Sequence, residues 1–76
     1  MSAVNYEPTM PRRRLNLLRE LSNLPPHACR FNVNLRIAEH LCRDGLAECV
    51  GELGNRGFAY VATNKGRIVA LLAVAA

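Results

Sequence analysis

Leucines recur at helical spacing in the segment RRRLNLLRELSNL, which begins directly after a proline. Steps of three and four residues place them along one side of a helix; they are Leu15, Leu17, Leu18, Leu21 and Leu24. The pattern therefore predicts an amphipathic helix over residues 11–22. Thr9 is placed to cap it and Pro11 to stand in its first turn, where a missing N–H costs nothing. Pro25 and Pro26 end it near residue 22 or 23.

A second apolar period, of four residues, runs through NVNLRIAEHLCRDG and predicts a helix over residues 33–44. Asn32 can cap this helix. Gly45 is well placed to end it in the left-handed conformation, with apolar Leu46 just beyond. The preceding stretch PPHACRFN is compatible with a short helical turn or with a loop.

After Gly45 the period changes from helical to extended. LAECV and FAYVA are short, β-rich segments, and GELGNRG between them holds three glycines, so residues 46–62 predict a β-hairpin with a flexible tip. Thr63 looks like a further N-cap. The following residues, NKGRIVALLAVAA, favour a helix over 64–75 through Ala and Leu, although Val and Ile allow a strand and Gly66 weakens the first turn.

The order of elements is helix, turn or link, helix, strand, loop, strand, helix. We therefore expect an α+β fold in which residues 11–76 form a single domain and residues 1–10 a flexible N-terminal arm. A chain of 76 residues buries about 60–65% of its unfolded surface, so the core is small.

Composition indicates the cellular compartment and the possible partners of the protein, but it does not identify its function. The net charge is +4, which fits a polyanionic partner but does not require one. The chain has 3 cysteines and its first residues lack an apolar core of signal-peptide length, which indicates reduced thiols in a cytoplasmic protein. The apolar run IVALLAVAA is far shorter than the roughly 20 residues that span a bilayer, so no membrane partner is expected.

Zinc-type ligands are present, but their spacing does not favour a metal site. His27 and Cys29, like His40 and Cys42, stand two residues apart. Residues two apart on a helix point to nearly opposite sides and cannot chelate together. Cys42 instead falls on the apolar side of its helix, and with Cys49 it is interpreted as a non-ligating thiol. We expect no metal and no cofactor.

Catalytic motifs are equally absent from the sequence pattern. Nucleophilic catalysis would need a base and an orienting group beside a cysteine, and no motif supplies them. GELGNRG is not a phosphate-binding loop, because it lacks the required lysine and lies between two strands. The sequence predicts a protein that is not an enzyme.

The second half of the chain resembles a winged helix-turn-helix domain of the MarR/PadR kind. The matching pieces are Gly45-Leu46, GNRG at 54–57 and TNKGR at 63–67, in that order. The resemblance implies that helix 33–44 reads DNA and that loop 51–57 is the wing. One departure is clear: between Leu24 and Gly45 there is room for one helix and at most one extra turn, so the helix that normally braces the reading helix is shortened or lost.

Polar residues on the second helix fit this interpretation. Arg36, His40 and Arg43 follow one another at i, i+4 and i+7, and Asn or Arg side chains can read bases through paired hydrogen bonds. Lysine and arginine elsewhere can bind phosphates. The predicted double-stranded-DNA contacts are Asn32, Asn34, Arg36, His40, Arg43, Arg56, Lys65 and Arg67. The alternative is a solvated polar face, since Glu39 and Asp44 would repel phosphates.

Two functions from different classes remain open. The first is a small bacterial or phage-like transcriptional regulator that binds DNA. The second is a winged-helix-like protein-interaction module, an accessory protein of phage or mobile-element style that binds or inhibits a partner. The apolar end Ile68–Ala76 would be buried either against helix 11–22 or in a homodimer that also involves that helix.

Overall fold

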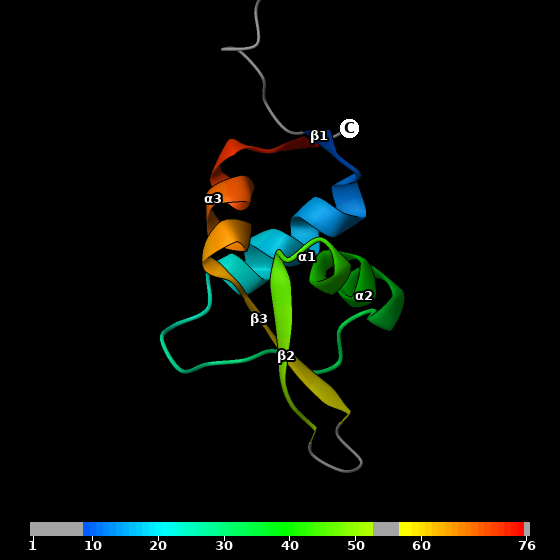
Figure 1. Cartoon of the computed structure of the whole chain (residues 1–76), viewed down its shortest axis with the longest axis vertical. Coiled ribbons are helices and arrows are strands. Elements are labelled where there is room, and N and C mark those ends of the chain that lie inside the picture. The colour runs from blue at the N-terminus through cyan, green and yellow to red at the C-terminus, as the bar shows by residue number, and fades with distance from the viewer. Residues whose placement is uncertain (1–8, 53–56, 76) are drawn as a thin grey trace, which may run out of the picture.

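The computed structural model describes residues 9–52 and 57–75. Three helices pack side by side, and a β-hairpin projects from them (Figure 1). The helices are α1 (Arg12–Ser22), α2 (Leu35–Arg43) and α3 (Asn64–Leu72). The hairpin strands are β2 (Ala47–Glu52) and β3 (Phe58–Ala62). The predicted α+β class and the order of these elements are confirmed.

The first helix lies at the centre of the fold and contacts both α2 and α3 (Figure 1). Its helical spacing brings Leu15, Leu18 and Leu21 to one side, where all three are fully buried. Leu41 of α2 meets them as the fourth large, fully buried side chain. The leucine pattern that predicted this helix therefore supplies three of the four largest fully buried side chains.

A short parallel pair of strands was not predicted. Strand β1 (Thr9–Met10) pairs with β4 (Val74–Ala75), with Thr9 opposite Val74. Two expectations are corrected here. Thr9 does not cap α1, because it lies in this strand and Pro11 occupies the N-cap position. The last helix ends at Leu72 and not at residue 75, because the chain then becomes extended to pair with β1.

The hairpin is antiparallel and carries one irregularity. Cys49 pairs with Tyr60 and Gly51 with Ala59, which leaves Val50 as an extra residue in β2. Arg30, in the link between α1 and α2, forms an isolated bridge with Tyr60, each backbone N–H donating to the other carbonyl over 3.0 Å. The link thus lies against the outer edge of β3. The tip of the predicted wing, which includes Arg56, lies outside the described residues.

The link itself contains no helix between Asn23 and Asn34. The sequence left open a short helical turn in PPHACRFN, and the structure shows turns and irregular backbone instead. His27 and Asn32 both have positive φ, 68° and 58°, a conformation that Asn tolerates better than most residues. The Arg30–Tyr60 bridge holds this link against β3.

Two helix ends meet at the junction between α2 and α3. Gly45 has a φ of +77°, as predicted for a left-handed helix end. The Thr63 hydroxyl donates to the Gly45 carbonyl oxygen (2.7 Å) and accepts from the Gly66 N–H (2.9 Å), so the predicted cap also joins the two helices. The Lys65 ammonium donates to the Asp44 carbonyl oxygen at 3.2 Å.

Candidate nucleic-acid interface

Helix α2 starts two residues later than the sequence indicated. Asn34, not Asn32, is the N-cap, because its side-chain oxygen accepts from the Ile37 N–H at 3.2 Å. Asn32 cannot take this role, since it precedes the helix by three residues in a left-handed conformation. Capping also occupies an oxygen that Asn34 would need for paired hydrogen bonds to adenine.

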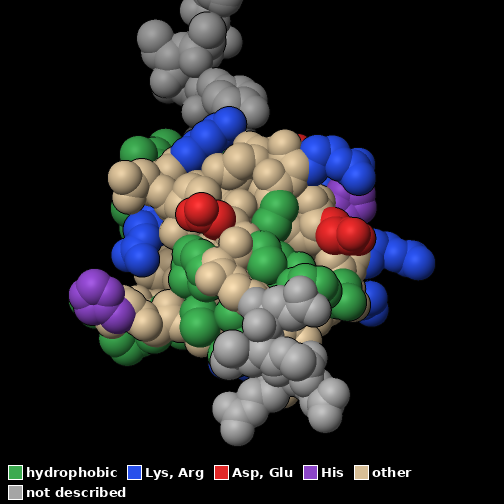
Figure 2. Space-filling view, turned by 60° about the horizontal axis from the view of Figure 1, so that its bottom comes forward, with side chains coloured by type: hydrophobic (Ala, Val, Ile, Leu, Met, Phe, Trp, Pro, Cys, Tyr) green, Lys and Arg blue, Asp and Glu red, His purple; other side chains and the backbone are tan. Residues whose placement is uncertain are grey.

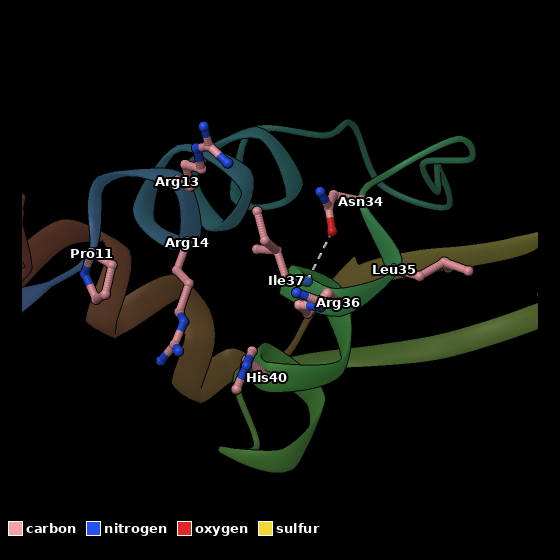
Figure 3. A pocket seen from close by; sticks show the side chains of 8 residues that line it. All are labelled: Pro11, Arg13, Arg14, Asn34, Leu35, Arg36, Ile37 and His40. Atoms are coloured by element: carbon pink, nitrogen blue, oxygen red, sulfur yellow. Dashed lines mark hydrogen bonds between the residues drawn. The ribbon is translucent and has the colours of Figure 1, made fainter.

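A basic hollow opens between the start of α1 and the start of α2 (Figure 3). Arg13 and Arg14 line it from α1, and Arg36 and His40 line it from α2. It has a volume of about 710 Å³ and is open to solvent. We call this site the cationic hollow.

The charge in the cationic hollow is unbalanced. Three guanidinium groups and one imidazole line it, and no carboxylate is among its described lining residues. The α2 N-terminus adds the positive end of a helix dipole. Guanidinium groups bind phosphate through paired, charge-assisted hydrogen bonds. The hollow therefore has the chemistry of a phosphate site.

A second hollow continues from the first along α1. It shares Arg13, Asn34 and Ile37 with the cationic hollow and has a volume of about 280 Å³. Asn16 and Asn32 contribute amide groups to its lining. We call it the amide hollow.

Among the residues that the structure describes, Glu20 is the single acid that lines the amide hollow. Its carboxylate forms an ion pair with Arg30 over 3.2 Å, with both side chains about half exposed. Exposed pairs of this kind contribute little to stability, about 0–1 kcal/mol. The Arg30 guanidinium does neutralise the negative charge of Glu20 beside the amide hollow.

A third hollow lies next to the amide hollow, beside the start of β3. Asn32 and Val33 are common to both, and Phe58 lines the new part. The Phe58 side chain is 40% exposed, which is unusual for a large aromatic residue in a small domain. We call it the Phe58 hollow.

The predicted DNA contacts do not form one stripe. Asn34, Arg36 and His40 meet in the cationic hollow, and Asn32 lies in the next one. Arg43 lines a separate hollow with Glu39, between α2 and the hairpin.

The predicted contacts on α3 lie elsewhere again. The Lys65 ammonium contacts the Asp44 carbonyl, and Arg67 lines a hollow beside Pro25 and His27. In Figure 2, Lys and Arg side chains stand around the margin of the face and apolar side chains fill its middle.

Sequence reasoning gave Arg13 and Arg14 only a general role as phosphate contacts, and it missed Asn16. A signal was present: Arg13, Asn16, Leu17 and Glu20 follow helical spacing, so they form a stripe beside the buried leucines. The link and α2 pack beside that stripe and form a hollow with it. The spacing of residues within α1 cannot predict which other segment packs there.

The Cys42 thiol lies in surroundings that keep it protonated. The pKa of the Cys42 thiol is raised above its ordinary value, mainly because burial disfavours the thiolate. The neighbouring Cys49 and Glu39 raise this pKa further. A raised pKa keeps the thiol protonated and unreactive. Within the described ranges, no group of three His, Cys, Asp or Glu side chains is arranged to hold a metal ion. In the same part of the chain, no helix has the length and apolar character needed to cross a bilayer.

Helix α3 exposes its large aliphatic residues in the single chain instead of burying them against α1. The alternative expectation, burial in a homodimer, stays a prediction. Ile68, Leu71 and Leu72 are 58%, 85% and 56% exposed. The inward side of α3 carries Gly66 and Ala70, because only small residues fit against α1 and Leu46. The large residues of α3 consequently point away from the core.

Comparison with known proteins finds no matching family model, no similar curated protein and no similar solved structure.

Proposed function

We propose that this chain is a small DNA-binding transcriptional regulator of winged-helix type, in which α2 approaches the nucleic acid and the β2–β3 hairpin is the wing. One observation carries the proposal: two helices bring Arg13, Arg14, Arg36 and His40 to one open hollow that no described carboxylate lines. Nucleic-acid phosphates are natural ligands of such a cationic cluster.

The order of elements supports the winged-helix part of the proposal. A helix that ends at Gly45 leads into an antiparallel hairpin, and a capped helix follows at Thr63. The MarR/PadR resemblance implies the same order. The Arg30–Tyr60 bridge offers a physical reason why the chain dispenses with a helix before α2, since it fixes the link against β3.

The test is fluorescence anisotropy with a labelled mixed-sequence duplex, repeated from low to physiological salt. We expect log K to fall linearly with log salt, with a slope corresponding to several phosphates. Arg36→Gln should weaken binding about tenfold and reduce the slope by roughly one. Arg67→Gln removes the same charge far from the cationic hollow and should change the affinity less than twofold.

Equal losses in the two variants would mean that net charge, not the cationic hollow, attracts DNA. Absence of binding to any nucleic acid at low salt, with the helical circular dichroism spectrum intact, would rule out the proposed function.

A second candidate function is protein interaction through α3. The 85% exposure of Leu71, next to exposed Ile68 and Leu72, favours it. The partner that we propose is a second copy, joined through the predicted segment Ile68–Ala76, of which Ala76 lies outside the described residues. Because the leucines of α1 are buried in the core, α3 and β4 would supply the contact.

Sedimentation velocity over a hundredfold range of concentration tests the dimer. The wild-type chain should sediment as a dimer, and Leu71→Glu should sediment as a folded monomer. A wild-type chain that remains monomeric throughout would remove the homodimer and leave only a different protein as partner.

A further inference from the structure

The residues expected to read bases line open hollows on the side of α2 that is next to α1. Asn32, Asn34 and His40 all line hollows that α1 residues also line. The major groove of DNA is about 12 Å wide and admits one helix of 10–12 Å diameter. Two helices packed 8–10 Å apart are wider than this groove. The two helices therefore cannot enter the groove together, and the side of α2 turned away from α1 is the side that base edges of an intact duplex reach most directly.

An unpaired nucleotide is not limited by the width of the major groove, because its base can enter a hollow on its own. The cationic and amide hollows are continuous through Arg13, Asn34 and Ile37. A phosphate can contact an arginine that lines the cationic hollow while its own base enters the neighbouring hollow. The volume of the amide hollow, about 280 Å³, is near the lower end of the range of small-ligand pockets, roughly 300–1,000 Å³.

The amide hollow has the lining that a base requires. Leu17, Val33 and Ile37 provide apolar contact for the base faces. The amides of Asn16 and Asn32 each offer donors and an acceptor, which match the hydrogen-bonding edge of an unstacked base. Both asparagines are exposed and neither has a hydrogen bond assigned within the described residues.

A neighbouring base has an aromatic contact available. The Phe58 hollow continues from the amide hollow through Asn32 and Val33. Partly exposed aromatic rings beside a basic groove are the usual platforms for single-stranded nucleic acid, because every base has a face that stacks.

We infer that the groove between α1 and α2 binds single-stranded nucleic acid, with a phosphate in the cationic hollow, its base in the amide hollow and the adjacent base on Phe58. This inference rests on the proposed function and specifies its substrate. The protein would then bind opened or single-stranded segments in preference to intact duplex.

The experiment compares a labelled 12-nucleotide mixed-sequence strand with the duplex of the same sequence, at one salt concentration. The wild-type chain should bind the single strand at least tenfold more tightly. Asn16→Leu keeps the side-chain size, removes the amide and should weaken single-strand binding about fivefold to tenfold. Phe58→Leu should weaken it about tenfold through lost stacking. Asn64→Ala removes an exposed helical asparagine on α3 and is the matched control.

Each outcome is decisive. Preferential single-strand binding that falls in Asn16→Leu and Phe58→Leu, but not in Asn64→Ala, supports the inference. Equal or tighter binding to the duplex, or an Asn16→Leu affinity like that of the control, overturns it and leaves the proposed function standing. Failure of the folded protein to bind either probe overturns both.

Discussion

The substitution Gly66→Ala tests how α3 is attached to the rest of the fold. A β-carbon built at Gly66 collides with the Leu46 carbonyl group and lies 3.2 Å from a methyl group of Leu18. The Leu46 carbonyl also accepts the Thr63 N–H at 3.0 Å, so it cannot move freely. At an ordinary helical site the same change would stabilise by about 0.4–1 kcal/mol.

Overpacking in a rigid core costs about 1–3 kcal/mol, and a collision with backbone belongs at the upper end. We therefore expect a net loss of about 2 kcal/mol. For a domain of 76 residues whose total stability is roughly 4–11 kcal/mol, this is a large fraction. Each kcal/mol lowers the Tm by about 4–8 °C at this size, so the Tm should fall by about 8–16 °C.

Differential scanning calorimetry and urea denaturation measure this loss. Gly51→Ala is the matched control, because a β-carbon there meets nothing within 4 Å, and its Tm should stay within about 4 °C of wild type. Gly66→Ala that is as stable as wild type, or more stable, would show that α3 does not contact Leu46 in this way.

Three further changes have defined outcomes. Thr63→Ala should cost about 1–2 kcal/mol in urea denaturation, because it removes both hydrogen bonds of the cap, while Thr63→Ser should keep most of the stability; a neutral Ala variant would contradict the cap. Leu71→Glu should change the Tm of the monomer by under about 4 °C, because the side chain is 85% exposed; a large loss would place Leu71 in a core. The folded-state pKa of Cys42 is raised, so the protonated thiol contributes to the free energy of unfolding fully at neutral pH, and this contribution is lost as the pH rises above about 9. Cys42→Ala should therefore lose less stability than wild type between neutral pH and pH values above about 9, as measured by urea denaturation. An equal loss of stability in the two proteins would exclude Cys42 as the source of the pH dependence.

The sequence predicted the helices, strands and helix ends that are determined by residues close together in the chain. The leucine spacing of α1 creates a face that must be buried, and Gly45 and Thr63 act through the backbone groups next to them. Strand β3 runs from Phe58 to Ala62 as predicted, because its β-rich residues directly follow a glycine loop. In each case the residues that form the element also supply the reason for it.

Features that depend on distant contacts were not predictable in this way. Periodicity predicted Asn32 as the cap of α2, whereas Asn34 is the cap in the structure, where the preceding link is bridged to β3 through Arg30. Gly66 was interpreted as a weakness of a helix, although close approach to Leu46 requires it. Half of the candidate site comes from α1, so no pattern within α2 alone revealed the groove.

The pairing of β1 with β4 also shapes how the protein folds. Thr9 and Val74 lie far apart in sequence and are neighbours in the structure, and the Arg19 guanidinium donates to the Ala73 carbonyl oxygen at 3.4 Å. Closing so long a loop is entropically costly and tends to come late. During synthesis at about 5–20 residues per second, α1 is complete roughly 3–10 s before β4 has been made, and the hairpin roughly 0.6–2.6 s before it. Met10, buried in the finished domain, has no strand partner until β4 has been synthesised.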